Sequence, residues 1–254
     1  MVSAPDGIPI VFLNAFPVDR EQWEPLIAAL GDRVDGDIIA FDFPGIGQMP
    51  MTDEEPSLEL IADAAVLAMR EATGHESAVW VGCSMGGYVA LAVAQREPTA
   101  VAGLGLLCTR ATPDDAEAAA KRRQTADDVA GTAGHPDPRG AAEGLVGTKG
   151  PAREELVSSV AENIARHGGD GIAWGQRAMA ARPDRTEVLR GVDAPVVVVI
   201  GGLDGVVPRE DADAMAQAAG VEPVVLEGVG HLSALEAPDE VAAALLDLLE
   251  AARA

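Results

Sequence analysis

The chain is poor in aromatic and basic residues, and each shortage excludes something. Aromatic side chains make up 3% of the 254 residues, so the core must consist mostly of Ala, Val and Leu. Only 18 Lys and Arg residues stand against 41 Asp and Glu residues, which gives a formal net charge of −23. A surface of this sign repels a phosphate backbone, so nucleic acid is excluded as a partner and an anionic membrane is disfavoured.

Cysteine and long apolar runs are also scarce. The two cysteines, Cys83 and Cys108, are too few for a disulfide framework. No apolar run approaches the roughly 18 residues that a membrane span needs, and the N-terminal residues do not resemble a signal peptide. We therefore expect a cytoplasmic protein with free thiols, no membrane partner, and no cofactor or metal. The oligomeric state stays open, with a homodimer as one alternative.

Short apolar runs alternate with helical patterns along the chain. Because continuously apolar strands separated by amphipathic helices are typical of parallel sheets covered on both faces, the sequence predicts an α/β fold with a mostly parallel sheet of about six to eight strands. Ligands of such sheets bind beyond the carboxyl ends of the strands. The strands are expected at residues 8–13, 37–41, 78–83, 101–108, 195–201 and 221–226, and the main helices at about 19–30, 58–73, 85–96 and 239–252.

Residues 110–192 interrupt this alternation. They contain no convincing strand, two helix starts at 112–115 and 150–155, and a loop-like segment at 131–150. Since the strand pattern stops and resumes around them, we predict a helical lid inserted into a core made of residues 1–109 and 193–254. A separate helical subdomain without a role at a site is the alternative. Candidates for an apolar lid lining, or for the lid's own small core, are Leu145, Ile172, Trp174 and Met179.

The stretch VWVGCSMGGY at residues 79–88 predicts a sharp turn from a strand into a helix at Ser84. Gly82 and Gly86 stand two residues to either side, where a side chain would collide across the bend. The Met85 N–H lies at the helix N-terminus, where the helix dipole favours developing negative charge. This pattern favours a nucleophilic serine, and the alternative is a glycine-rich turn with a serine cap.

A serine nucleophile needs a base and an orienting acid. Of four histidines, only His231 belongs to a core loop at the carboxyl end of a predicted strand. Asp204 occupies the corresponding loop after the preceding strand, although Asp204-Gly205 is also an ordinary turn sequence. The second oxyanion donor should come from the loop after the first strand, where Phe16 has an N–H group and Pro17 has none.

These stretches resemble the α/β-hydrolase superfamily over nearly the whole chain. The resemblance lies in NAFP at 14–17, DFPGIG at 42–47, GCSMGG at 82–87, GLD at 202–204 and GHLSALEAP at 230–238. Within this superfamily, GCSMGG at 82–87 and LLCT at 106–109 are most similar to small cofactor-free hydrolases typified by 3-oxoadipate enol-lactonases. Two features depart from the family: Asn14 replaces its usual His, and few residues precede the first strand, where the family has an extra hairpin.

The resemblance implies a serine hydrolase that cleaves a small carboxylic ester or lactone through an acyl-enzyme, with Ser84, Asp204 and His231 as the triad. Phe16 and Met85 would form the oxyanion hole. Alternatives are a perhydrolase or haloperoxidase, a C–C bond hydrolase, or a ligand-binding protein with a vestigial triad. The residues expected to contact substrate are Phe16, Cys108, Arg110 and Trp174, with Arg110 or Arg177 available to a substrate carboxylate.

Overall fold

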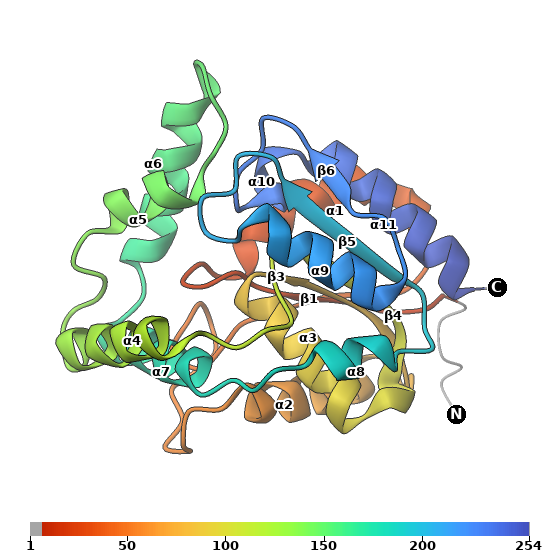
Figure 1. The fold of residues 1–254 in the computed structure, drawn as a ribbon, viewed down its shortest axis with the longest axis horizontal. Coiled ribbons are helices and arrows are strands. Elements are labelled where there is room, and N and C mark those ends of the chain that lie inside the picture. The colour runs from red at the N-terminus through yellow and green to blue at the C-terminus, as the bar shows by residue number, and fades with distance from the viewer. Residues whose placement is uncertain (1–6, 254) are drawn as a thin grey trace.

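A computed structural model describes residues 7–253, in which six strands form one parallel sheet (Figure 1). The strands lie in the order β2-β1-β3-β4-β5-β6, and all neighbouring pairs are parallel. The chain leaves β1 toward one edge and returns to its other side at β3, so the order reverses between these two strands. The strands are β1 (Ile10–Leu13), β2 (Ile38–Phe41), β3 (Ala78–Cys83), β4 (Val101–Leu107), β5 (Val196–Gly201) and β6 (Val224–Leu226).

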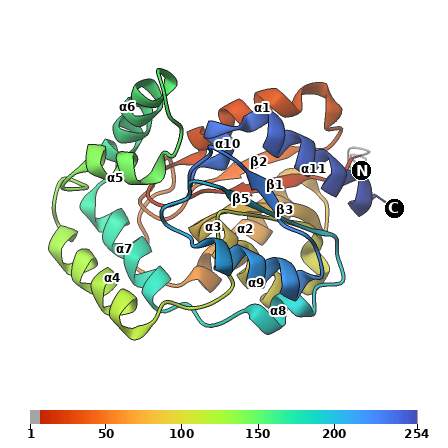
Figure 2. The same cartoon turned by 45° about the horizontal axis from the view of Figure 1, so that its top comes forward.

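Helices cover both faces of the sheet, as Figures 1 and 2 show. One layer contains α2 (Leu58–Thr73), α3 (Met85–Arg96), α8 (Thr186–Arg190) and α9 (Arg209–Ala219), which pack on one another and on β3 and β5. The opposite layer contains α1 (Glu24–Leu30), α10 (Ser233–Glu236) and α11 (Pro238–Ala252). Three short 3-10 helices complete the core: Arg20–Trp23, Gly31–Arg33 and Pro98–Ala100.

Alternate residues of β3 fill separate cores on the two faces of the sheet. Trp80 points into the core beside α2 and α3, whereas Val79 and Val81 point into the core beside α1 and α11. In the second core the rings of Phe12 and Trp23 stack with centroids 4.7 Å apart. Because both faces are buried, every residue of β3 is apolar or small, which is why this strand could be read from the sequence.

The segment between β4 and β5, residues 110–192, is entirely helical or irregular and is called the insertion below. Its first four helices stand to one side of the sheet, beyond the carboxyl ends of the strands, whereas α8 lies against α3 and α9 in the core layer (Figures 1 and 2). The four are α4 (Ala116–Val129), α5 (Pro138–Leu145), α6 (Ala152–Ala165) and α7 (Gly169–Ala180). The division of the chain into a core and a lid stays a prediction.

The predicted α/β fold is confirmed, with corrections in detail. The helix expected at 19–30 consists of a 3-10 turn and then α1, because Pro25 is accommodated only in a first helical turn. The loop-like segment 131–150 contains α5, whose N-terminus is capped by the Asp137 side chain accepting from Gly140 N–H. The first six residues, where an extra hairpin was considered, lie outside the described residues. Within residues 7–253, no helix has both the length and the apolar character required to cross a bilayer.

Candidate active site

The turn after β3 has the backbone geometry that its glycines predicted. Ser84 has φ 53° and ψ −115°, an unfavourable conformation for a residue with a side chain, which costs about 1–3 kcal/mol. A Cβ atom on Gly82 would lie 2.2 Å from the Gly86 carbonyl oxygen, and one on Gly86 would lie 1.9 Å from the Leu13 carbonyl oxygen. Only glycine therefore allows the first turn of α3 to approach the ends of β1 and β3 so closely.

Neighbouring strands hold this turn in place. The Ser84 N–H donates to the Leu107 carbonyl at 3.0 Å, and the Thr109 hydroxyl donates to the Ser84 carbonyl at 2.7 Å. Ser84 is 8% exposed, and Met85 begins the 12-residue helix α3. The Ser84 side chain therefore sits at the positive end of a helix, where an anion is stabilised.

His231 and Asp204 come from adjacent loops and contact each other directly. The imidazole Nδ1 lies 3.0 Å from Asp204 Oδ1 and 2.9 Å from Oδ2, and each side chain is 1% exposed. The same carboxylate accepts the N–H groups of Val206 and Val207 at 2.8 and 3.0 Å. Asp204 therefore has both roles that its sequence suggested: its carboxylate closes the turn by accepting two backbone N–H groups, and it also orients the imidazole of His231.

The environment of Asp204 favours the ionised carboxylate. Burial alone would raise its pKa, but the hydrogen bond and charge of His231, together with the N–H groups of Val207 and Val206, outweigh burial and lower the pKa below its usual value. The carboxylate is thus available to accept the Nδ1 proton of His231, which leaves Nε2 of the neutral ring free to accept a proton.

The histidine loop is bonded to the serine turn and to the insertion. The Cys83 thiol donates to the His231 carbonyl at 3.5 Å, which places the histidine beside the residue that precedes Ser84. The Glu236 carboxylate accepts the N–H groups of Gly230 at 3.0 Å, Gly147 at 2.9 Å and Thr148 at 2.6 Å. Glu236 therefore ties the loop that carries His231 to the end of α5.

Phe16 follows β1, whose Leu13 pairs with Gly82 of β3, so the loops that carry Phe16 and Ser84 leave neighbouring strands. The Phe16 ring packs against α7, since a Cβ on Gly175 would lie 2.4 Å from its Cε2 atom. Asn14, the departure from the family pattern, donates its amide to Asp42 Oδ1 at 3.0 Å and accepts the Trp23 indole N–H at 2.8 Å. This asparagine thus satisfies two buried partners behind the Phe16 loop.

Three of the residues expected to contact substrate have partners within the protein, and their contact with substrate stays a prediction. Cys108 is fully buried, and its thiol donates to the Gly230 carbonyl at 3.6 Å, so it lies beneath the histidine loop. Burial raises the pKa of this thiol to about 12. Trp174 is 4% exposed and donates its indole N–H to the Glu54 carbonyl at 3.2 Å. Arg110 forms ion pairs with Asp211 at 3.2 Å and with Asp114 at 3.7 Å, and Asp114 also pairs with Arg122 and Arg182.

The other candidates in the insertion have structural positions. Leu145, Ile172 and Met179 are at most 8% exposed and belong to the cores, and Arg177 forms a surface ion pair with Asp127 at 2.9 Å. A hollow of about 270 Å³ does open between the insertion and the loops after β4 and β5. Its lining residues are Arg110, Asp114, Ala118, Lys121, Arg122, Thr125, Gln176 and Val206.

Within residues 7–253, one group of side chains has the composition and spacing to hold a metal ion. The possible ligand atoms of Cys108, Asp204 and His231 lie within 4.8 Å of one another. Two of these side chains already bond to each other, and the Cys108 thiol is bonded to Gly230. Their proximity therefore follows from the hydrogen bonds of the histidine loop.

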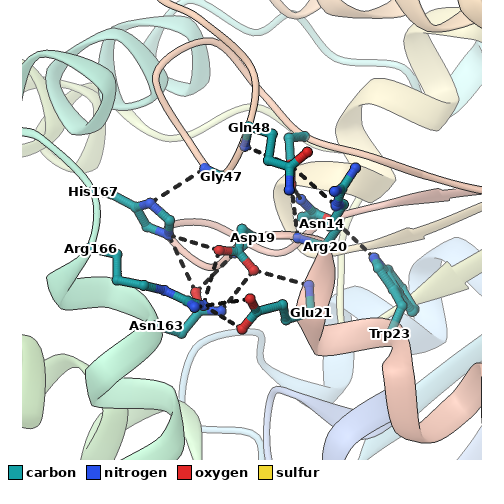
Figure 3. A network of polar contacts seen from close by, with 11 residues as sticks. Asn14, Asp19, Arg20, Glu21, Trp23, Gly47, Gln48, Asn163, Arg166 and His167 are labelled. Atoms are coloured by element: carbon teal, nitrogen blue, oxygen red, sulfur yellow. Dashed lines mark hydrogen bonds and ion pairs between the residues drawn. The ribbon is translucent and has the colours of Figure 1, made fainter.

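Sequence reasoning missed a buried polar cluster beside the Phe16 loop, drawn in Figure 3. It joins Asp19, at the end of this loop, to Asn163 and His167 at the end of α6. The available signal was the i, i+4 spacing of Asn163 and His167, which places two polar side chains on one side of a helix end.

Comparison with known proteins agrees with this geometry. The family model described as "Alpha/beta hydrolase family" matches residues 10–244. The 3-oxoadipate enol-lactonase 1 of Acinetobacter baylyi is 26% identical over 246 residues, which cover 94% of this chain and 88% of the relative. The pimeloyl-[acyl-carrier protein] methyl ester esterase of Yersinia pestis is 26% identical over 254 residues, which cover 95% and 93%.

A solved structure of a thermophilic esterase from Thermogutta terrifontis, with malate bound, superposes with a TM-score of 0.90. It is 29% identical, and the match covers 99% of this chain and 92% of the esterase. The chain belongs to the alpha/beta hydrolase family, and its structural neighbours include esterases. Family membership supports hydrolysis as the class of reaction, and the substrate is a separate question.

Proposed function

We propose that the protein is a serine hydrolase of small carboxylic esters or lactones, with Ser84 as nucleophile, His231 as general base and Asp204 as the orienting acid. The observation that carries the proposal is the bond from His231 Nδ1 to the Asp204 carboxylate, 2.9 Å long and almost fully buried, on the loop bonded to Cys83. Such a bond holds the imidazole in the tautomer whose Nε2 accepts a proton.

The mechanism follows from these positions. His231 takes the Ser84 proton as Oγ attacks the substrate carbonyl, and Asp204 stabilises the imidazolium that forms. The N–H groups of Met85 and Phe16 are proposed to donate to the oxyanion. Met85 is the first residue of α3, and Phe16 lies in the loop after β1, the strand next to β3. The imidazolium then protonates the leaving alcohol, and a water molecule, activated by the same histidine, releases the acid from Ser84.

The insertion is proposed to act as the lid that selects substrates. It lies beyond the carboxyl ends of the strands, contacts Phe16 through α7 and contacts the histidine loop through Gly147 and Thr148. Arg110, Lys121 and Arg122 line the hollow beside these loops, and Arg110 is itself ion-paired with Asp211 and Asp114. Comparing the turnover of neutral and carboxylated lactones tests whether this basic lining serves a substrate carboxylate, and slower turnover of the carboxylated series would show that it does not.

The direct test is hydrolysis of a p-nitrophenyl ester by the wild type and by Ser84→Ala. We expect the variant to lose at least about a thousandfold in kcat, because the remaining oxyanion donors act without a nucleophile. Retention of most activity would refute the assignment of Ser84. A peroxide-dependent halogenation assay and a screen of ring-fission diketones examine the perhydrolase, haloperoxidase and C–C hydrolase alternatives on the same fold.

A further inference from the structure

The end of α6 holds the Phe16 loop through a reciprocal pair of hydrogen bonds. Asn163 Oδ1 accepts the Asp19 backbone N–H at 3.0 Å, and Asn163 Nδ2 donates to Asp19 Oδ1 at 2.8 Å (Figure 3). Asn163 is 8% exposed and Asp19 is 5% exposed. Because a buried polar group without a partner costs about 1–3 kcal/mol, this pair fixes the spacing between the insertion and the loop.

His167 adds a third element to this contact. Its Nδ1 accepts the Gly47 N–H at 3.4 Å, and its Nε2 faces Asn163 Oδ1 at 3.3 Å and Asp19 Oδ2 at 3.7 Å. The acceptor role of Nδ1 requires a neutral ring with its proton on Nε2. His167, at 4% exposure, therefore joins α6 to the turn after β2 as well as to the Phe16 loop.

The charges around His167 come from every element packed against it. Asp19 precedes the first 3-10 helix, Glu21 lies within it, Asp42 follows β2, and Arg166 precedes His167 itself. Burial lowers the pKa of His167, Arg166 lowers it further, and the three carboxylates oppose this, with a net lowering. The neutral ring that Gly47 requires is thus the form present at neutral pH.

The core and the insertion hold the Phe16 loop from opposite ends. On the core side, Asn14 is bonded to Asp42 and Trp23, and the Ala15 N–H donates to Gln22 Oε1 at 3.1 Å. On the insertion side, α7 packs on the Phe16 ring and α6 binds Asp19. The Phe16 N–H therefore lies between two anchors, and only one of them belongs to the core.

We propose that Asn163 and His167 are positioning residues that hold the Phe16 N–H where it stabilises the oxyanion. The proposal rests on the proposed function and adds that the insertion helps to assemble the catalytic site. Loss of the anchor displaces a donor that matters most in the transition state, so it lowers kcat more than it changes KM. Protonation of His167 places a donor against the Gly47 N–H and weakens the same anchor.

The first test is Asn163→Ala, with Arg139→Gln as the control, because Arg139 forms only exposed ion pairs with Glu143 and Glu154 within the insertion. We expect Asn163→Ala to lower kcat on a p-nitrophenyl ester about tenfold to a hundredfold, with KM within about twofold. Hydrogen exchange of a peptide covering residues 14–20 should become faster in this variant. The control should match the wild type in both measurements.

The second test uses His167→Asn, whose amide oxygen can accept from Gly47 N–H and does not titrate. In the wild type, log kcat should fall more steeply at acid pH than loss of the general base alone explains, because protonation of His167 also weakens the anchor of the Phe16 loop. The variant should keep kcat within about threefold at neutral pH and show the slope of a single protonation. This milder variant also serves if Asn163→Ala does not fold.

The outcomes separate the two proposals. Faster exchange of residues 14–20 with unchanged kcat overturns the positioning role and leaves the proposed function intact, and so does an identical acid limb in the wild type and His167→Asn. If Ser84→Ala keeps the esterase activity, the proposed function fails and the positioning role fails with it.

Discussion

Replacing Asp204 with asparagine tests the orientation of the histidine without removing the turn. The carboxylate accepts from Val206 N–H, Val207 N–H and His231 Nδ1, all within 3.0 Å. In Asp204→Asn the amide oxygen can keep both backbone N–H groups, which leaves the NH₂ group facing Nδ1. Nδ1 must then accept, its proton moves to Nε2, and Nε2 can no longer take the Ser84 proton.

We expect Asp204→Asn to lower kcat on a p-nitrophenyl ester by about 10⁴-fold, equivalent to about 5.4 kcal/mol of transition-state stabilisation. The variant should remain folded under the assay conditions, because the turn keeps its hydrogen bonds to Val206 and Val207. Asp213→Asn is the matched control, since Asp213 forms a half-exposed ion pair with Arg209 on α9. A loss of less than about tenfold in a folded Asp204→Asn protein would refute this account of the histidine's tautomer.

Three further predictions concern stability and thiol reactivity. Gly86→Ala should lower the free energy of unfolding in urea by about 1–3 kcal/mol or more, because the new Cβ would collide with the Leu13 carbonyl oxygen. The control is Gly144→Ala, whose new Cβ has no atom within 4 Å, and this variant should be as stable as the wild type. Folding lowers the pKa of Asp204, so the ionised carboxylate stabilises the folded state. This stabilisation is fully present above the usual pKa of 3.8 and is lost as the pH falls below it. The difference in free energy of unfolding between the wild type and Asp204→Asn should therefore become smaller as the pH is lowered. Cys83 and Cys108 should react with a disulfide reagent only after unfolding, because both are buried and burial raises both pKa values; rapid reaction of the native protein would contradict this.

Much of the fold could be predicted because its elements are buried in regular ways. The elements at 58–73, 78–83 and 85–96 have the predicted bounds, since each has a continuous apolar face and a clear start or stop. The turn at Ser84 could be predicted because the backbone passes so close to positions 82 and 86 that only glycine fits there, and both glycines are visible in the sequence.

The contacts of the insertion could not be predicted in the same way. Asn163 and Asp19 are separated by 144 positions, and nothing local to either indicates the other. Arg110 was a candidate for a substrate carboxylate because its strand-end position was visible, but its pairing with Asp211, from α9, depends on tertiary packing. The hydrogen bond from the Trp174 indole to the Glu54 carbonyl could not be predicted for the same reason.

The most direct test of the central claim is labelling of the intact protein with a fluorophosphonate, followed by mass spectrometry of its peptides. We expect a single covalent adduct on Ser84, formed slowly or not at all in His231→Ala and absent in Ser84→Ala. An unlabelled native protein, or an adduct at a residue other than Ser84, would contradict it.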